Sequence, residues 1–340
     1  MEKTMRFGIL GCGVVADYHA RAIDSLENAE LWGVADNNTS KAISFAEKYG
    51  VKAYSDFASM LADADIDAVC ICTPSGMHAQ NALEALAAKK HVVVEKPMAL
   101  NTSDADRMIR ACRENKRMLT VICQLRFSDD VQKLKRLVKE RAFGKLGLCD
   151  LYMKYWRSPQ YYQNSPWKGT KEMDGGGALI NQGIHGVDAL LYILGDAKLL
   201  SAKAKTLYHE IEVEDTAVAM LEFDGGALGV IEASTCSYPG FDRKIEICGS
   251  NGHAVWREGR IEKLVIGDQV IVSSSDMGLL STSSNPTAMS PLLHAKQIDN
   301  FINAIHGKEK LLIDAMEGRR AIALIEEIYR TSATCLSNQK

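Results

Sequence analysis

Short apolar segments alternate with helical patterns through the first 125 residues, and this alternation limits the possible folds more than any other feature. The apolar segments lack polar residues at every second position, which is typical of strands covered on both faces. Strands separated by single helices predict βαβ units, and therefore an α/β, doubly wound parallel sheet in residues 1–125. The expected strands are residues 5–10, 29–35, 68–73, 92–95 and 118–123. The expected helices are residues 14–25, 40–49, 79–88 and 103–115, the last capped by Ser103.

The pattern changes after Leu125, where strands follow one another without helices between them. We expect residues 126–340 to form a second, α+β domain around a large, mostly antiparallel sheet with meander order. A glycine-led apolar helix is expected at 175–195, and a Ser-, Thr- and Asn-rich mobile loop at 273–291. The remaining expected strands are residues 148–156, 199–208, 216–223, 227–237, 244–249 and 253–256. The remaining expected helices are residues 131–141, 291–305 and 315–336.

Composition removes several classes of function. Lys and Arg (40) nearly balance Asp and Glu (43), so no basic excess exists to neutralise a nucleic-acid backbone. No apolar run approaches the roughly 18 residues that span a bilayer. The nine cysteines are odd in number and include no Cys-x-x-Cys pair, which is typical of a reduced compartment. The basic start before the apolar residues 7–16 imitates a signal peptide, but its glycines fit a strand and loop better. We therefore expect a cytoplasmic protein with no nucleic-acid partner.

A glycine-rich turn follows the first predicted strand and opens the first predicted helix. Its residues, Gly11-Cys12-Gly13-Val14-Val15-Ala16, match the G-x-G-x-x-G/A pattern of dinucleotide-binding turns. Gly11 permits the tight turn, and Gly13 lets the backbone approach a pyrophosphate. The free N–H groups at Val14 and Val15 would then face the phosphate charge. The pattern predicts a dinucleotide site.

The second predicted strand ends at Asp36, followed by Asn37. A carboxylate at this point can accept a hydrogen bond from a ribose 2′-hydroxyl and would repel a 2′-phosphate. No arginine follows that could bind such a phosphate. We therefore expect NAD, with NADP less favoured; the alternative is that Asp36 only shapes a turn.

Further polar residues follow the third, fourth and fifth predicted strands. Thr73, Pro74 and His78 follow the third strand, and Glu95 and Lys96 end the fourth. Ligands of open parallel sheets bind at the carboxyl ends of the strands, so these residues should line the same crevice as the glycine turn. Gln124 leaves the fifth strand at the domain junction and is a further candidate cofactor ligand.

The helix expected after Gly175 carries polar residues on an otherwise apolar sequence. Asn181, His185 and Asp188 stand at i, i+4 and i+7, so they share one helical face. Burying such groups without a function would be costly, which favours a catalytic site over a structural histidine. Asp188 would orient His185 or complete local hydrogen bonds. No metal site is expected, because no His-Glu-x-x-His or clustered Cys and His spacing occurs.

These motifs together resemble the glucose–fructose oxidoreductase, inositol dehydrogenase and MocA (Gfo/Idh/MocA) family over essentially the whole chain. The resemblance implies a Rossmann domain, a second α/β domain that often mediates oligomerisation, and a nicotinamide cofactor. It also implies oxidation or reduction at a carbon of a sugar, cyclitol or sugar derivative. The family's lysine at the position of Lys96 reaches the reacting hydroxyl, and its histidine at the position of His185 transfers the proton.

One residue departs from many members of that family. They carry an aspartate where this chain has Asn181, and an amide cannot act as a general base. Asn181 can still orient a hydroxyl by hydrogen bonding. The base is therefore either His185, with Lys96 stabilising charge on the oxygen, or a desolvated Lys96.

The loop expected at 157–174 mixes aromatic rings with cations. Rings such as Trp167 suit the apolar face of a pyranose, and Arg157 suits a carboxylate or phosphate. The alternative is a surface loop whose aromatic residues pack under the domain.

The predicted strand 216–223 is apolar on both faces, with Val218 and Met220 on one and Ala217, Ala219 and Leu221 on the other. One face can pack on helices, and a second subunit would cover the other. We therefore expect a homo-oligomer, a dimer or tetramer formed through this sheet.

Three function classes remain after these arguments. The first is an NAD-dependent dehydrogenase acting on a sugar or polyol. The second is a glycoside hydrolase of the same architecture that uses transient oxidation, and the third is a non-catalytic NAD-bound sugar-binding protein. The pairing of Lys96 with His185 favours an enzyme. Which sugar is bound, and whether a nucleotide is attached to it, stays open.

Overall fold

The computed structural model describes residues 3–271 and 291–337 and divides into two compact units. The first contains residues 1–124 and 290–319, and the second contains residues 125–289 and 320–340. Residues 291–319, which the sequence pattern placed in the second domain, group with the first unit. The predicted loop at 273–291 lies, except for Pro291, outside the described residues.

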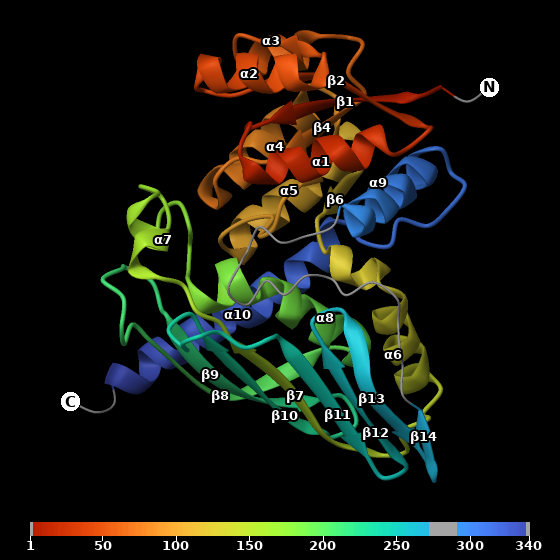
Figure 1. Cartoon of the computed structure of the whole chain (residues 1–340), viewed down its shortest axis with the longest axis vertical. Coiled ribbons are helices and arrows are strands. Elements are labelled where there is room, and N and C mark those ends of the chain that lie inside the picture. The colour runs from red at the N-terminus through yellow and green to blue at the C-terminus, as the bar shows by residue number, and fades with distance from the viewer. Residues whose placement is uncertain (1–2, 272–290, 338–340) are drawn as a thin grey trace. The chain divides into compact units, whose positions relative to one another are not determined.

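The first unit is built on a six-stranded parallel sheet with the order β3-β2-β1-β4-β5-β6 (Figure 1). This confirms the parallel α/β sheet expected from the sequence. Prediction missed β3 because it has only two residues, both exposed, and so carries no apolar pattern. The strands are β1 (Met5–Leu10), β2 (Ala29–Ala35), β3 (Lys52–Ala53), β4 (Ala68–Ile71), β5 (His91–Val94) and β6 (Leu119–Val121).

Helices cover both faces of this sheet. Phe7 and Ile9 of β1 share one buried cluster with residues of α1, α2 and α9. Gly8, between them, faces Met60 of α3 on the other side. The helices are α1 (Val14–Asp24), α2 (Thr39–Tyr49), α3 (Phe57–Ala62), α4 (His78–Ala87), α5 (Thr102–Asn115) and α9 (Leu292–Ile305), with a 3₁₀ turn at Ser75–Met77.

Side-chain caps set where several of these helices begin. Asn38 caps α2 by accepting a hydrogen bond from the backbone N–H of Lys41. Asn101 caps α5 by accepting from the N–H of Asp104. The expected cap at Ser103 was therefore wrong: the asparagine two residues earlier is an equally strong cap and starts the helix first.

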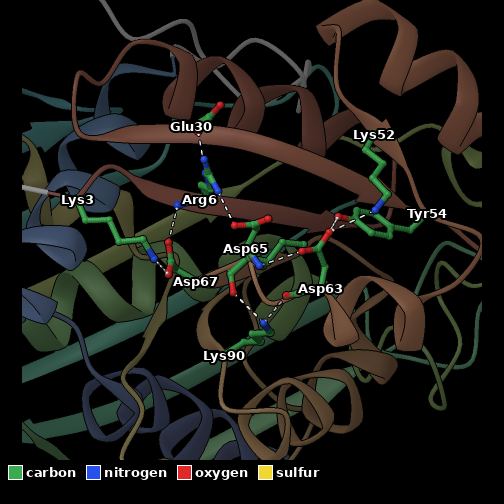
Figure 2. Close-up of polar contacts among 10 residues, drawn as sticks. Lys3, Arg6, Glu30, Lys52, Tyr54, Asp63, Asp65, Asp67 and Lys90 are labelled. Carbon is green, nitrogen blue, oxygen red and sulfur yellow. Dashed lines mark hydrogen bonds and ion pairs between the residues drawn. The ribbon is translucent and has the colours of Figure 1, made fainter.

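The amino ends of the strands are joined by a charged network, shown in Figure 2. Arg6 of β1 binds Asp65 at 2.7 Å and Glu30 at 3.2 Å. Lys90, almost fully buried, donates to the carbonyl oxygens of Asp63 and Ile66. These contacts tie the β1, β2, β4 and β5 ends together at the edge opposite the glycine turn.

The second unit is built on an eight-stranded sheet with the order β14-β13-β12-β11-β7-β10-β9-β8 (Figure 1). The pairing is antiparallel except between β7 and β10, so the sheet is mostly antiparallel as expected. The simple meander was wrong, because β7 lies between β11 and β10. The strands are β7 (Leu146–Lys154), β8 (Ala197–Lys205), β9 (Thr216–Phe223), β10 (Leu228–Ser234), β11 (Lys244–Gly249), β12 (Gly252–Arg257), β13 (Arg260–Ile266) and β14 (Gln269–Ile271).

The helices of the second unit include the predicted glycine-led helix, which is not uniform. Its first part, Ala178–Gly183, has π geometry, and α8 (Ile184–Leu194) continues it. π turns within helices are frequent at functional sites. The other helices are α6 (Asp129–Lys139), α7 (Pro159–Gln163) and the part of α10 (Ala315–Ser337) beyond residue 319. No described helix is both long and apolar enough to cross a membrane.

The two faces of β9 differ in how deeply their side chains are buried. Ala217, Ala219 and Leu221 are buried, whereas Val218 and Met220 are 46% and 48% exposed. Met220 pairs across the sheet with Val230, which is partly exposed. The second unit therefore leaves an apolar strip of the sheet in solvent.

Candidate active site

Gly11 is required by the fold itself. It follows β1, has φ of +90°, and donates its N–H to the carbonyl of Ala35 at 2.8 Å. A Cβ at this position would lie 2.7 Å from the carbonyl oxygen of Cys72. Only glycine fits such a crowded left-handed turn.

Gly13 differs from Gly11 in its backbone conformation and in the space around it. Its φ is −84°, which any residue adopts, and a Cβ would meet nothing within 4 Å. It is the N-cap of α1 and offers no side-chain cap, while Val14 beside it is 62% exposed. The first turn of α1 therefore presents backbone N–H groups to an open space, which is the arrangement that binds phosphate. The protein's own packing gives no reason for glycine at 13, and close approach of a ligand does.

Asp36 follows β2 and turns back to the glycine turn. One carboxylate oxygen accepts from the Cys12 N–H at 2.8 Å, and the other accepts from the Asn38 N–H at 2.7 Å. Asn37 is exposed beside it. A cavity of about 430 Å³ adjoins this turn, lined by Cys12, Asn38, Ser40, Lys41, Ser44, Phe45 and Lys48. Burial and the Asp36 charge raise the pKa of Cys12 to about 12, so this thiol stays protonated.

His78 joins the segments that follow β4 and β5. Its Nδ1 lies 2.7 Å from the Pro97 carbonyl oxygen, and its Nε2 lies 2.8 Å from that of Thr73. Burial lowers the pKa of His78. Thr73 and Pro74 are partly buried, and the Thr73 hydroxyl donates to Asn81. His78 thus holds the two strand-end segments together.

Glu95 and Lys96 follow β5 directly. Glu95 is buried, and one of its oxygens lies 2.9 Å from His19 Nε2. Its other oxygen accepts from the backbone N–H of Lys96 at 3.2 Å. Burial would raise the pKa of Glu95, but the hydrogen bond to His19 and the nearby His294 hold it well below its usual value. The Glu95 carboxylate is therefore ionised. Lys96, which is partly exposed, directly follows this firmly held residue.

Gln124 ends the first unit after β6 and is buried. Its Oε1 has no hydrogen-bond partner among the described residues. A buried carbonyl oxygen without a donor is costly, so a donor from a ligand would satisfy it. With the glycine turn, Asp36 and Lys96, Gln124 is one of the predicted cofactor residues that follow the carboxyl ends of β1, β2, β5 and β6.

In the second unit, Glu214 fixes the start of the π turn. Its carboxylate accepts from the backbone N–H groups of Gly177 at 3.0 Å and Leu179 at 2.8 Å. The Tyr329 hydroxyl donates to the same carboxylate at 2.8 Å. A Cβ on Gly177 would lie 2.1 Å from the Glu214 carbonyl oxygen, so this glycine is needed for close packing. Sequence reasoning missed Glu214, because nothing in the β8–β9 segment marks it as the partner of a helix 37 positions earlier.

Asn181 is buried, and both the nitrogen and the oxygen of its side-chain amide are hydrogen-bonded. Its amide nitrogen donates to the Asp174 carboxylate, and its oxygen accepts from Gln182 at 3.2 Å. His185, one turn further along, is partly exposed. Both oxygens of Asp188 bind Arg126. Asn181 and His185 are thus carried by one helix, as predicted.

Arg157 is joined to the same helix. Its Nε and one terminal nitrogen donate to Gln182 Oε1 at 3.0 and 2.8 Å, and it is only 4% exposed. Gln182 in turn donates to the Tyr161 hydroxyl at 2.9 Å. Lys168 lies over the Tyr161 ring at 3.7 Å. Trp167 is partly buried, and its carbonyl accepts from Thr170.

The predicted residues therefore form one set in each unit. Sequence reasoning missed Gln182 and Asp174, which link Arg157 and Asn181, and also missed His19 and His294. Gln182 stands inside the glycine-led motif and Asp174 stands directly before it, but neither was assigned a role. His294 had no signal, because it lies on a helix from the distant end of the chain.

A glycine turn at the start of a parallel sheet, with a lysine and an unsatisfied amide at neighbouring strand ends, defines a Rossmann-type nicotinamide-dependent oxidoreductase. Comparison with known families agrees. Residues 5–123 match the model of the oxidoreductase family with an NAD-binding Rossmann fold, and residues 131–255 match the GFO/IDH/MocA C-terminal domain. The chain belongs to the Gfo/Idh/MocA family of oxidoreductases.

Individual relatives cover most of the chain. Myo-inositol 2-dehydrogenase of Thermotoga maritima is 31% identical, over 78% of this chain and 79% of its own. D-glucoside 3-dehydrogenase of Escherichia coli is 27% identical, over 98% and 97%. A crystal structure of the WlbA dehydrogenase of Bordetella pertussis with NADH and UDP-GlcNAcA has a TM-score of 0.86 and 32% identity, over 97% of each chain.

Proposed function

We propose that this enzyme is an NAD-dependent dehydrogenase that oxidises a secondary hydroxyl of a sugar, cyclitol or sugar derivative. The observation that carries the proposal is the open space at Gly13, where the uncapped first turn of α1 meets no protein atom. The relatives support the substrate class, because their names give inositol and glucoside dehydrogenation. Bound NAD would supply the hydride acceptor.

The reacting hydroxyl must lose a proton as its carbon is oxidised. Lys96 is proposed to hold the hydroxyl oxygen and stabilise negative charge on it. His185 is proposed to take the proton, because an imidazole is an effective base near neutral pH. The alternative, with a deprotonated Lys96 as the base, stays open. Asn181, held by Asp174 and Gln182, is proposed to orient the hydroxyl.

NAD is proposed as the preferred cofactor because of the Asp36 carboxylate. Both of its oxygens accept backbone N–H groups, which holds its charge at the end of β2. That charge opposes a 2′-phosphate. Lys41 and Lys48 line the neighbouring cavity, and their positive charges would favour a 2′-phosphate. Both NAD and NADP therefore belong in the assay.

Arg157 and Trp167 are proposed to contact the substrate. Arg157 is linked through Gln182 to the helix that carries Asn181 and His185. We also propose a homo-oligomer formed through the exposed strip around Val218 and Met220, and a cytoplasmic location. A glycoside hydrolase with transient oxidation is the second candidate, because it would use the same Lys96 and His185.

The test is reduction of NAD and of NADP across free sugars, inositols, other polyols and nucleotide sugars. We expect NADH formation with one substrate class, and loss of at least about a hundredfold in kcat in Lys96→Ala and His185→Gln. Release of an aglycone without net NADH would instead identify the hydrolase. Binding of NAD and sugar with no turnover of either kind would identify a binding protein and contradict the proposal.

A further inference from the structure

A buried cluster of three titratable side chains lies directly before Lys96. Glu95 Oε1 is 2.9 Å from His19 Nε2 and 3.8 Å from His294 Nε2. The three side chains are between 0% and 9% exposed. His19 comes from α1 and Glu95 from the end of β5, whereas His294 comes from α9, near the other end of the chain.

The packing holds the His294 ring firmly in place. It stacks on Tyr18 with ring centroids 6.2 Å apart and meets the His19 ring edge-on at 5.6 Å. Burial lowers the pKa of His294, which favours the neutral ring. Its Nδ1 is buried and has no hydrogen-bond partner among the described residues. Such a group is unfavourable in a core, so α9 carries His294 for a reason other than packing.

The second carboxylate oxygen of Glu95 contacts the backbone of Lys96. Glu95 Oε2 accepts the backbone N–H of Lys96 at 3.2 Å. On the following residue, the Pro97 carbonyl faces His78 Nδ1 at 2.7 Å. The backbone on both sides of the Lys96 side chain is therefore held by buried side chains, and the hold on its N–H depends on the rotamer of Glu95.

We propose that His19 and His294 are positioning residues, which act through the Glu95 carboxylate to fix the backbone from which Lys96 reaches the substrate hydroxyl. This inference rests on the proposed role of Lys96. His19 is bonded to one oxygen of Glu95, and the other oxygen is aimed at the Lys96 N–H. The His294 ring packs against His19 and lies beside the first oxygen. Removal of the His294 ring frees the bonded pair of His19 and Glu95 to move, and the Lys96 backbone is then no longer fixed.

A metal ion is the competing explanation for this cluster. The three potential ligand atoms lie within 4.8 Å of one another. However, 2.9 Å between His19 Nε2 and Glu95 Oε1 is an ordinary hydrogen-bond length. His294 Nε2, at 3.8 Å from the same oxygen, is held beside this bond by ring packing. The geometry is that of a hydrogen-bonded brace.

The test compares His294→Leu, which removes the polar ring edge beside Glu95 Oε1, with His294→Gln, whose amide nitrogen can reach the position of Nε2. The control is His306→Leu, an exposed histidine at the end of the same helix. We expect His294→Leu to lower kcat by on the order of tenfold to a hundredfold, with little change in the Kd of NAD. His294→Gln should recover most of the loss, and His306→Leu should resemble the wild type.

A double-mutant cycle then separates positioning from a merely structural role. In a Lys96→Ala background, measured in single turnovers, His294→Leu should lower the rate by less than about twofold. A similar loss in both backgrounds would overturn the proposal, as would equal losses in His294→Leu and His294→Gln. If Lys96→Ala turns over like the wild type, the proposed role of Lys96 fails on its own, and this inference falls with it.

Chemical labelling gives a readout that does not depend on turnover. Trace acetylation followed by mass spectrometry measures the reactivity of the Lys96 amine, with exposed Lys89 as the internal reference. We expect the Lys96 to Lys89 labelling ratio to change at least about threefold in His294→Leu and to return in His294→Gln. An unchanged ratio would contradict the proposal. Stoichiometric zinc or iron in the purified protein, lost in His294→Leu, would replace the brace with a metal site.

Discussion

Arg126 and Asp188 form a bidentate ion pair inside the second unit. Arg126 Nε donates to Asp188 Oδ2 at 3.0 Å, and a terminal nitrogen donates to Oδ1 at 2.7 Å. The side chains are 1% and 2% exposed, and the guanidinium lies over the Tyr192 ring. The pair fastens α8, and with it the turn that carries His185, to the segment after β6.

Removing one partner of this pair should be costly, because it leaves the other charge buried alone. We expect Asp188→Leu to lower the free energy of unfolding by about 3–5 kcal/mol. Arg126→Met combined with Asp188→Leu should recover much of that loss, since a well-packed apolar pair replaces the ions. Urea unfolding measures both. A loss below about 1 kcal/mol in Asp188→Leu would show that the pair is not the fastening described here.

The two glycines of the cofactor turn should respond oppositely to alanine. Gly13→Ala places a Cβ in empty space at an ordinary φ, so we expect the free energy of unfolding of the apoenzyme to change by less than about 1 kcal/mol. The Kd of NAD should rise at least about tenfold, because the Cβ occupies the space of the phosphates. Calorimetric titration and thermal unfolding check the two effects.

Gly11→Ala is the matched comparison. Its φ of +90° and the 2.7 Å approach to the Cys72 carbonyl oxygen strain any side chain. We expect it to destabilise the apoenzyme by more than about 1 kcal/mol. Equal stability losses in the two variants, or normal NAD binding by Gly13→Ala, would contradict this division of roles.

His91 should make the first unit less stable in mild acid. Burial, together with the Arg117 charge, lowers its pKa from 6.5 to about 4. Its Nδ1 accepts the Met118 N–H at 3.1 Å, which also requires the unprotonated ring. Between pH 6.5 and pH 4, His91 is therefore protonated in the unfolded chain but not in the folded one. Stability should fall as the pH drops through that window, by up to about 3 kcal/mol.

The variant that checks this is His91→Asn, whose side-chain oxygen can still accept the Met118 N–H. Urea midpoints at pH 7 and pH 4.5 should differ less in His91→Asn than in the wild type. Parallel pH dependence in the two proteins would rule out His91 as the source.

The apolar strip on the second sheet should hold copies of the chain together. Met220→Glu places a charge beside Val230 in the strip, so we expect the dissociation constant of the oligomer to rise at least about tenfold. Sedimentation velocity across a concentration series measures it. Ile43→Glu, at a similarly exposed apolar residue of α2, is the control and should leave association unchanged. A wild-type protein that sediments as a single chain at every concentration would refute the oligomer.

Local pattern was enough to predict most of the first unit. Buried strands such as β4 and β5 are continuous apolar segments, and the glycine turn has a fixed spacing, so both are readable within a few residues. Helix α3 was missed although Asp56 and Ser59 form a capping box, because the helix has only six residues. The order of the second sheet was not readable, because pairing of β7 with β10 depends on contacts between distant segments.

The same limit applies to the site. Gly13, Lys96 and His185 were predicted as site residues because each stands in a short motif. Glu214 and His294 were not found, because their partners, Gly177 and Glu95, are far away in the sequence. A single sequence records which residues can pair, but not which ones do.

Helix α9 completes the first unit from the far end of the chain. Its buried residues Ile298, Phe301 and Ile302 join the core built by β1 and α1, and Gln297 binds the Cys123 N–H and the Val121 carbonyl at the sheet edge. During synthesis, residues 1–124 leave the ribosome long before α9 exists. The cofactor-binding unit must therefore wait, with this apolar surface uncovered, until the whole eight-stranded sheet of the second unit has been translated.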